Sequence, residues 1–271
     1  GPEVGKSLLE ERWDFIMYTG GVQVAKIVAA AAAEHLTPTL LELGGKNPCI
    51  VDNSAKIKVA ARRIIFGKFL NCGQTCIAPD YVLVHASVKH ALVKAIVEAI
   101  QDSYGADQSN SEDYGCIIND HHFERLKSLL HSQNIIYGGN TNPKKRYIQP
   151  TLIDLIDTNN PMMEEEIFGP ILPILTYEND TDLKTIIKQY EKPLSFYVFS
   201  ERKSWSKNIM RSYSYGGGII NDTLLQFTNR NLPFGGIGKS GTGAYHGKHS
   251  FFAFTHYKPY IKRSSWPDPY F

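Results

Sequence analysis

The stretch Phe15-Ile16-Met17-Tyr18-Thr19-Gly20-Gly21 gives the first sign of the fold, because a short apolar run of strand type ends there in a glycine pair. An alanine-rich run from Val22 to His35 follows directly and has the composition of a helix. A strand, a glycine turn and a helix in this order direct the free N–H groups of the helix start toward an anion. Many such turns bind nothing, so Gly20 and Gly21 are candidate phosphate-binding residues with a purely structural turn as the alternative.

Short apolar runs and helical patterns alternate along the rest of the chain. Strands are expected near residues 39–45, 81–84, 148–153, 171–175, 196–199 and 219–220, and helices over 57–70, 88–100, 123–130, 183–190 and 205–213. The helix over 57–70 is expected to have one broad apolar side, formed by Val59, Ile64, Phe66 and Leu70. Lys68 is one of the polar residues that interrupt it. This alternation is typical of an α/β protein with a largely parallel sheet.

Composition and charge describe an ordinary globular chain of 271 residues, enough for one large or two medium domains. Hydrophobic residues make up 42% and charged residues 21%. The net charge of +2 gives no electrostatic case for a nucleic-acid partner or an anionic membrane. The sequence predicts no signal peptide and has no apolar run long enough to cross a bilayer.

The four cysteines, Cys49, Cys72, Cys76 and Cys116, are spaced in no zinc-binding pattern and have no histidine pair at ligand spacing beside them. Four cysteines in a chain of this size also make a poor disulfide framework. The sequence therefore predicts no metal site and a reducing compartment, which points to the cytoplasm.

The loop Asn71-Cys72-Gly73-Gln74-Thr75-Cys76-Ile77-Ala78-Pro79 carries the candidate nucleophile. Gly73 allows a tight backbone and Pro79 prevents a helix from continuing, so Cys76 lies among small and polar residues where its side chain can face a cleft. A thiol is the most nucleophilic side chain available near neutral pH. The alternative is that Cys76 is a buried small hydrophobic residue.

Two further segments present a carboxylate. Thr39 to Gly45 has apolar or β-prone residues around one acid, which predicts a strand that carries Glu42 into a site; the alternative is an edge-strand glutamate in solvent. Met163 to Pro170 runs from three acidic residues into an apolar-aromatic turn. There Glu166 is a candidate acceptor for sugar hydroxyls and Phe168 a candidate aromatic wall, with a charged helix start before a core strand as the alternative.

A third segment, Pro233 to Gly241, is rich in glycine and contains Lys239-Ser240. A nucleotide-hydrolase loop needs a glycine five residues before its Gly-Lys pair, and Pro233 stands at that position. The residues that follow, Gly241-Thr242-Gly243, oppose a helix. The segment is therefore not expected to hydrolyse nucleotides.

Taken together and in this order, the segments resemble the aldehyde dehydrogenase superfamily over nearly the whole chain. The four matching motifs are Leu41 to Lys46, the glutamate signature; Asn71 to Cys76, the cysteine signature; Glu165 to Pro170; and Leu232 to Gly236. Ala78 to Tyr81 and Gly243 to Lys248 resemble the class 3 or fatty-aldehyde branch. The resemblance implies the remnant of a Rossmann-type NAD(P)-binding domain in residues 1–41, an α/β catalytic domain in 42–240, and a segment, 241–271, that returns toward the nucleotide domain.

The resemblance also implies the chemistry, which is oxidation of a small-molecule aldehyde to a carboxylic acid with NAD or NADP. Cys76 is then the nucleophile that forms a thiohemiacetal and a thioester, and Glu42 is the base that activates the hydrolytic water. In the cofactor site, Gly20 and Gly21 are expected at the pyrophosphate, Glu166 at the nicotinamide ribose and Phe168 at the nicotinamide ring. Residues of the substrate or structural loop are Asn71, Gln74 and Phe234. A homodimer of the full-length protein is implied as well.

Several departures from the family pattern set further expectations. Gly21 and Ala25 replace a serine and a glycine of the family's phosphate turn, and Gln226 stands where class 3 relatives carry a histidine. The family's first βαβ units and its oxyanion asparagine precede the first residue, so the isolated chain is expected to lack turnover and to need the missing segment or a partner. Membrane attachment is expected only through segments outside these residues. The alternatives are a cysteine-dependent esterase or acyltransferase without redox chemistry, and a non-catalytic family member with a structural role.

Overall fold

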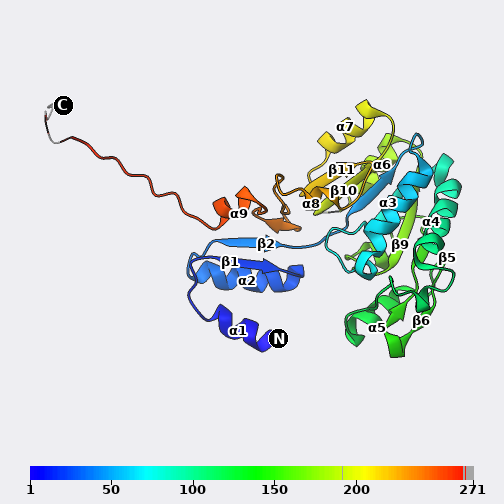
Figure 1. Ribbon diagram of the computed structural model, residues 1–271, viewed down its shortest axis with the longest axis horizontal. Helices are drawn as coiled ribbons and strands as arrows, with labels where there is room; N and C mark the ends of the chain where they lie inside the picture. Colours follow the sequence, from blue (N-terminus) through cyan, green and yellow to red (C-terminus); the bar gives the residue numbers. More distant parts are fainter. Residues whose placement is uncertain (191, 265, 267–271) are drawn as a thin grey trace.

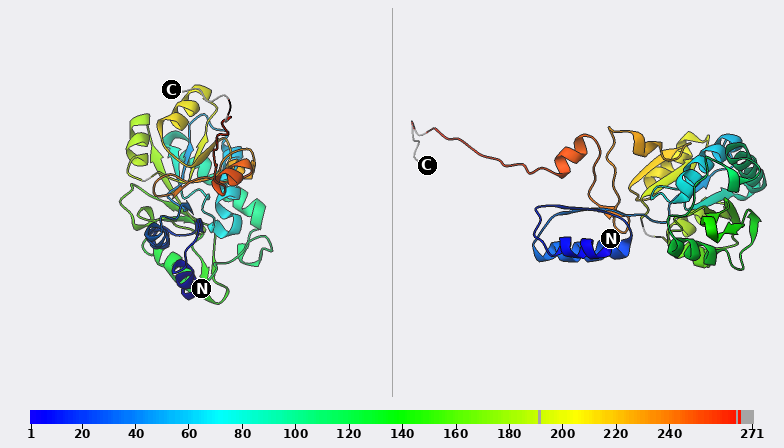
Figure 2. Two further views of the ribbon diagram at one scale, coloured as in Figure 1. Left: turned by 90° about the vertical axis from the view of Figure 1, so that its left-hand side faces the viewer. Right: turned by 60° about the horizontal axis from the view of Figure 1, so that its bottom comes forward.

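The computed structural model describes residues 1–190, 192–264 and 266. These residues form a small sheet with its helices and a larger sheet with its helices, which lie end to end (Figure 1). Residues 254–264, after the last helix, follow an extended path away from the large sheet (Figure 2). Residues 265 and 267–271 of the expected C-terminal segment lie outside the described residues.

The small sheet contains the predicted strand, glycine turn and helix. Its strands are β1 (Ile16–Thr19), β2 (Thr39–Glu42) and β12 (Gly241–Thr242), in the order β1-β2-β12, with β1 and β2 parallel and β12 antiparallel to β2. Helices α1 (Pro2–Leu9) and α2 (Val22–Glu34) lie on one side of this sheet, and α9 (Lys248–Ala253) lies on the other (Figure 1). The strand and helix expected on either side of Gly20-Gly21 are thus confirmed.

The large sheet has seven strands in the order β11-β10-β3-β4-β9-β8-β5, all parallel to their neighbours except β5. All four residues of β3 and the first four of β4 are buried, as expected where helices cover both faces of a parallel sheet. The strand bounds are β3 (Pro48–Val51), β4 (Tyr81–His85), β5 (Ile135–Tyr137), β8 (Thr151–Asp154), β9 (Ile171–Tyr177), β10 (Ser195–Phe199) and β11 (Gly217–Ile220).

The helices of the large sheet confirm the predicted segments within a few residues at their ends. Their bounds are α3 (Ile57–Phe69), α4 (Lys89–Tyr104), α5 (Asp120–Leu129), α6 (Asp180–Ile187), α7 (Lys203–Ser212) and the short α8 (Leu225–Thr228). A two-stranded ribbon of β6 (Thr141–Asn142) and β7 (Tyr147–Ile148) lies beside them. Within the described residues, no helix is both long enough and apolar enough to span a membrane.

Two expectations about local structure were wrong. On α3, Phe66 and Leu70 are exposed while Lys68 is 1% exposed, because the buried stripe follows the alanines and isoleucines, Ala60, Ala61, Ile64 and Ile65. The strand expected over 148–153 is two strands, β7 and β8, because Pro150 supplies no N–H to continue a ladder.

The chain passes from one sheet to the other through five residues, 43–47, which link the end of β2 to the start of β3. It returns in the segment between β11 and β12, where the N–H of Leu43 donates to the carbonyl of Ser240. The predicted site segments gather at this junction, near the amino-terminal ends of β3, β4 and β10. The carboxyl end of β3 is filled instead by a buried carboxylate, Asp52, which pairs with Arg202.

Candidate active site

The cysteine loop begins with a left-handed turn at the end of α3. Asn71, Cys72 and Gly73 have φ values of 51°, 53° and 72°, a conformation that favours glycine. A Cβ built on Gly73 would lie 2.3 Å from the carbonyl oxygen of Gly169, so the loop packs directly against the segment that carries Glu166 and Phe168. Glycine at position 73 is therefore needed for both its conformation and its lack of a side chain.

Gly73→Ala is expected to lower the free energy of unfolding by about 2–3 kcal/mol, because it adds a backbone clash to left-handed strain. Chemical denaturation of both proteins measures the change. Gly105→Ala is the matched control, since Gly105 also has a positive φ of 81° but no atom within 4 Å of the added Cβ. Equal losses for the two variants would mean that the contact with Gly169 contributes nothing.

Side-chain amides hold the loop on either side of Cys76. The Gln74 amide donates to the carbonyls of Asn71 and Cys116, both at 3.1 Å, and accepts from the N–H of Ile118. Asn71 donates back to the Gln74 carbonyl, so the two polar side chains of the loop contact the loop itself and the chain at 116–118.

On the other side of Cys76, the buried Asn47 donates to the carbonyls of Cys76 and Ala78 at 2.8 and 3.0 Å. Asn47 also accepts from the N–H of Ser195 on β10, which ties the loop to two strands of the large sheet. The backbone around the thiol is thus fixed from both directions, as a preorganised site requires.

Cys76 is half-buried and packs, with Tyr245, against an apolar cluster formed by Ile77, Leu194, Leu224 and Phe234. Burial, followed by the charges of Glu166 and Glu42, raises the pKa of the thiol to about 11, while the N–H groups of Cys76 and Ile77 act in the opposite direction. The sulfur is therefore protonated at neutral pH in this state and needs a proton acceptor to become a nucleophile. The two N–H groups directed at the sulfur can also stabilise negative charge that develops beside it.

Glu42, the last residue of β2, is 3% exposed, so the solvent-facing alternative does not hold. Neither of its carboxylate oxygens has a hydrogen-bond partner among the described residues. Burial raises the pKa of this carboxyl to about 8, so small changes in its surroundings shift it between acid and base near neutral pH.

Glu166 lies against the glycine pair that follows Glu42. A Cβ on Gly44 would lie 2.1 Å from a Glu166 carboxylate oxygen, and the N–H of Gly45 donates to that carboxylate. Burial and then Asp80 raise the pKa of Glu166 to about 8, against the influence of Lys46 and Lys68. Phe168, two residues on, has a positive φ of 50° and is 38% exposed, which leaves its ring accessible beside the site.

A buried ion pair holds the Glu166 segment in place, and no local pattern in the sequence indicated it. Lys46 pairs with Asp80 and donates to the carbonyls of Met162 and Glu165 at 2.6 and 3.1 Å. Asp80 accepts from the N–H of Ile167 at 2.9 Å, and Arg125 donates to the Ile167 carbonyl.

Lys68 is a second buried cation near this pair, with its pKa lowered to about 8, mainly by burial. Its place in the core stripe of α3, four residues after Ile64, was the only local signal of that burial.

The junction thus brings Cys76, Glu42, Glu166 and Phe234 together from segments far apart in the sequence. Gln226 donates to Tyr197 and Ser195 on β10. Gly20 and Gly21 lie at the start of α2 in the small sheet. Within the described residues, no group of three or more His, Cys, Asp or Glu side chains is arranged to hold a metal ion.

The aldehyde dehydrogenase family model matches residues 1–260. The chain belongs to this family. Aldehyde dehydrogenase family 3 member A2 of Rattus norvegicus is 49% identical over 259 residues, which cover 96% of this chain and 54% of that protein. The dimeric NADP-preferring aldehyde dehydrogenase of Rattus norvegicus is 48% identical over 257 residues, which cover 95% of this chain and 57% of that protein.

A solved structure described as the substrate-bound state of Staphylococcus aureus AldH superposes with a TM-score of 0.97 at 49% identity. The match covers 99% of this chain and 59% of that one. This chain therefore has the aldehyde dehydrogenase fold, and it spans a little over half the length of the curated relatives it matches.

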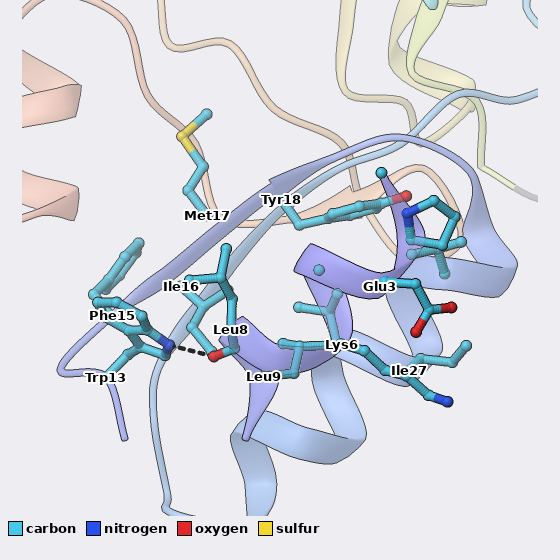
Figure 3. Close-up of a pocket in the computed structure, with 15 residues that line it drawn as sticks. Glu3, Lys6, Leu8, Leu9, Trp13, Phe15, Ile16, Met17, Tyr18 and Ile27 are labelled. Atoms are coloured by element: carbon cyan, nitrogen blue, oxygen red, sulfur yellow. Dashed lines mark hydrogen bonds between the residues drawn. The ribbon is translucent and has the colours of Figure 1, made fainter. Parts of the chain in front are cut away.

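An aldehyde dehydrogenase needs a place for NAD or NADP, and the small sheet fits that requirement. The N-cap of α2 is Gly21 and no side chain caps the helix, so its first N–H groups are free to meet a pyrophosphate. A cavity of about 910 Å³ is lined by residues of α1, β1 and α2 and of the chain between α1 and β1 (Figure 3). Its walls are largely apolar, which suits a flat aromatic base, and include Leu8, Leu9, Ile16, Met17, Tyr18 and Ile27.

Proposed function

We propose that Cys76 and Glu42 are the nucleophile and the base of an NAD(P)-dependent aldehyde dehydrogenase that oxidises medium- or long-chain aliphatic or aromatic aldehydes. The observation that carries the proposal is that a half-buried thiol, packed against an apolar cluster, interacts with a buried carboxyl that has no hydrogen-bond partner among the described residues. The thiol has two N–H groups directed at its sulfur, and the carboxyl has a pKa of about 8.

In the proposed reaction, Cys76 gives up its proton to solvent and its sulfur attacks the aldehyde carbon, so that the carbonyl electron pair moves onto oxygen. The N–H of Cys76 can stabilise that oxyanion. NAD or NADP would supply the hydride acceptor, and loss of the hydride from the thiohemiacetal carbon would leave a thioester on Cys76. Glu42 then takes a proton from water, hydroxide adds to the thioester, and the carbon–sulfur bond breaks to release the acid and the thiolate.

The remaining site residues have supporting parts in the proposal. Glu166, held by Gly45 and flanked by cations, is the hydroxyl acceptor for the nicotinamide ribose, and Phe168 covers the nicotinamide. Gly20 and Gly21 hold the pyrophosphate at the start of α2. Asn71 and Gln74 shape the loop, since their hydrogen bonds stay within it and with the chain at 116–118, and Phe234 forms the apolar wall beside Cys76.

The proposal extends to organisation and location. Residues 1–41 belong to the nucleotide domain and 42–240 to the catalytic domain, with 241–271 returning to the former; the pairing of β12 with β2 supports that return. A homodimer is proposed because a relative is named as dimeric. All four cysteines are free, which supports a reducing, cytoplasmic location.

The proposal is tested by measuring reduction of NAD and of NADP by a long-chain and an aromatic aldehyde. A second assay needs no cofactor: p-nitrophenyl acetate should acetylate Cys76, and intact-mass measurement then follows loss of the acetyl group. Failure of Cys76 to accept the acetyl group, with aldehyde oxidation also absent, would contradict the proposal.

Glu42→Gln is expected to leave acetylation of Cys76 nearly unchanged and to slow deacetylation by at least about a hundredfold, because the water loses its base. Intact mass should therefore show a trapped acetyl-enzyme. Glu98→Gln is the control, since Glu98 is an exposed residue of α4 that pairs only with Lys94. Deacetylation of Glu42→Gln at the rate of the control would rule out Glu42 as the base.

A further inference from the structure

Tyr245 lies beside the proposed thiol, and the motif that contains it, Gly243 to Lys248, assigned it no role. Its side chain packs, together with Cys76, against the apolar cluster that contains Phe234. The backbones of Tyr245 and Phe234 exchange two hydrogen bonds of 2.8 Å, and their rings lie 5.8 Å apart. The ring is therefore held against this apolar cluster rather than on an exposed loop.

The same segment is attached to the strand that carries Glu42. Strand β12 pairs with β2, so that Gly241 lies opposite Glu42 and Thr242 opposite Leu41. Three residues after β12 the chain reaches Tyr245. The phenol is close enough to Glu42 and Cys76 that, after burial, their charges raise the pKa of Tyr245.

The second observation is that hydrogen-bonding groups of Glu42 and Tyr245 lack partners. Both carboxylate oxygens of Glu42 are buried without a partner, which is costly once the group ionises. Among the described residues, the Tyr245 hydroxyl also makes no hydrogen bond. A donor without a hydrogen bond and two acceptors without partners thus belong to side chains that interact electrostatically.

We propose that the Tyr245 hydroxyl donates a hydrogen bond to the ionised Glu42 carboxylate, directly or through one water, and so positions the base of the hydrolytic step. This inference rests on the proposed function, because it assigns Tyr245 a part only if Glu42 is that base. Tyr245 is a positioning residue: it acts through Glu42 and forms no bond to the reacting carbon.

The physical consequence concerns the ionisation of Glu42. A donor that favours the charged form lowers a carboxyl pKa, so the proposed hydrogen bond holds the pKa of Glu42 below the value of about 8 that burial alone gives, and removal of the hydroxyl raises it toward that value. Less of the carboxylate is then available at neutral pH. The titratable groups around this cleft are Glu42, Cys76, Glu166, Tyr245 and the neighbouring His246. Acetylation blocks Cys76 and simplifies the titration.

The test is the pH dependence of deacetylation of acetyl-Cys76 in Tyr245→Phe, followed by intact mass. The midpoint of the rate profile is expected to move up by about one pH unit, which lowers the rate at neutral pH about tenfold, with the two profiles converging at high pH. Tyr260→Phe is the matched control, because Tyr260 is 86% exposed on the same C-terminal segment. Glu42→Gln, which should flatten the profile, shows that Glu42 is the titrating group.

The other outcomes contradict either the role of Tyr245 or the proposed function. Superimposed profiles for Tyr245→Phe and wild type, or an equal drop at every pH, would remove the role of Tyr245 and leave the proposed function intact. A wild-type thiol that accepts no acetyl group, or a profile unchanged in Glu42→Gln, would overturn the proposed base and the inference with it. Circular dichroism of Tyr245→Phe verifies that the variant is folded.

Discussion

Cys76→Ala is expected to lower acetyl transfer to the protein and, in the presence of the segment or partner that the chain is expected to need, aldehyde-dependent reduction of NAD or NADP by at least about a thousandfold, because no neighbouring group can form the thioester. Cys72 cannot replace it: that thiol is 1% exposed, and burial raises its pKa to about 12. The measurements are intact mass after exposure to p-nitrophenyl acetate and absorbance of the reduced nicotinamide.

The control for this variant is Cys116→Ala, which removes an exposed thiol whose side chain lies outside the cleft. It should keep wild-type acetylation of Cys76, located by peptide mapping. Retention of activity in Cys76→Ala would contradict the nucleophile assignment, and transfer of the acetyl group to Cys72 would contradict the inertness of the buried thiol.

Asp80→Asn is expected to produce the largest loss of stability, about 3–5 kcal/mol, because it leaves the buried Lys46 ammonium without its anion. Asparagine can still accept from the N–H of Ile167, so the loss reports mainly the charge. Chemical denaturation at neutral pH measures the change in unfolding free energy. Substrate or cofactor addition is not needed.

Glu201→Gln is the comparison for Asp80→Asn, since it breaks the exposed pair with Lys56 and should cost less than about 1 kcal/mol. Similar losses in the two variants would mean that the Lys46–Asp80 pair behaves as a surface pair. The double variant Lys46→Met with Asp80→Asn is expected to lose less unfolding free energy than Asp80→Asn alone. This difference would show that the isolated buried charge of Lys46 causes the loss in the single variant.

The sequence predicted the α/β alternation well because strand and helix leave strong local periods. It failed on α3, where the large residues Phe66 and Leu70 suggested a buried side but the small Ala60 and Ala61 lie in the core. Small side chains such as alanine allow close packing, but they add little to the hydrophobicity by which a buried helix face is recognised in the sequence. Strand β3 escaped notice because four residues beginning with Pro48 show too little periodicity.

At the site, motifs identified Cys76 and Glu42, but the groups that hold them depend on contacts across the chain. Asn47 bonds to residues near 76 and to Ser195, and Lys46 bonds to residues near 162. No local pattern links such distant positions. Tyr245 is another case, since its place beside Glu42 follows from the pairing of β12 with β2 and not from its neighbours in sequence.

The five residues that link β2 to β3 separate the two groups of the proposed reaction into two sheets. Glu42 is the last residue of β2 in the small sheet, whereas Cys76 lies in the loop before β4 of the large one. Any rotation of one sheet against the other would therefore change the separation of carboxyl and sulfur, and a ligand that contacts both sheets would hold that separation without contacting either group.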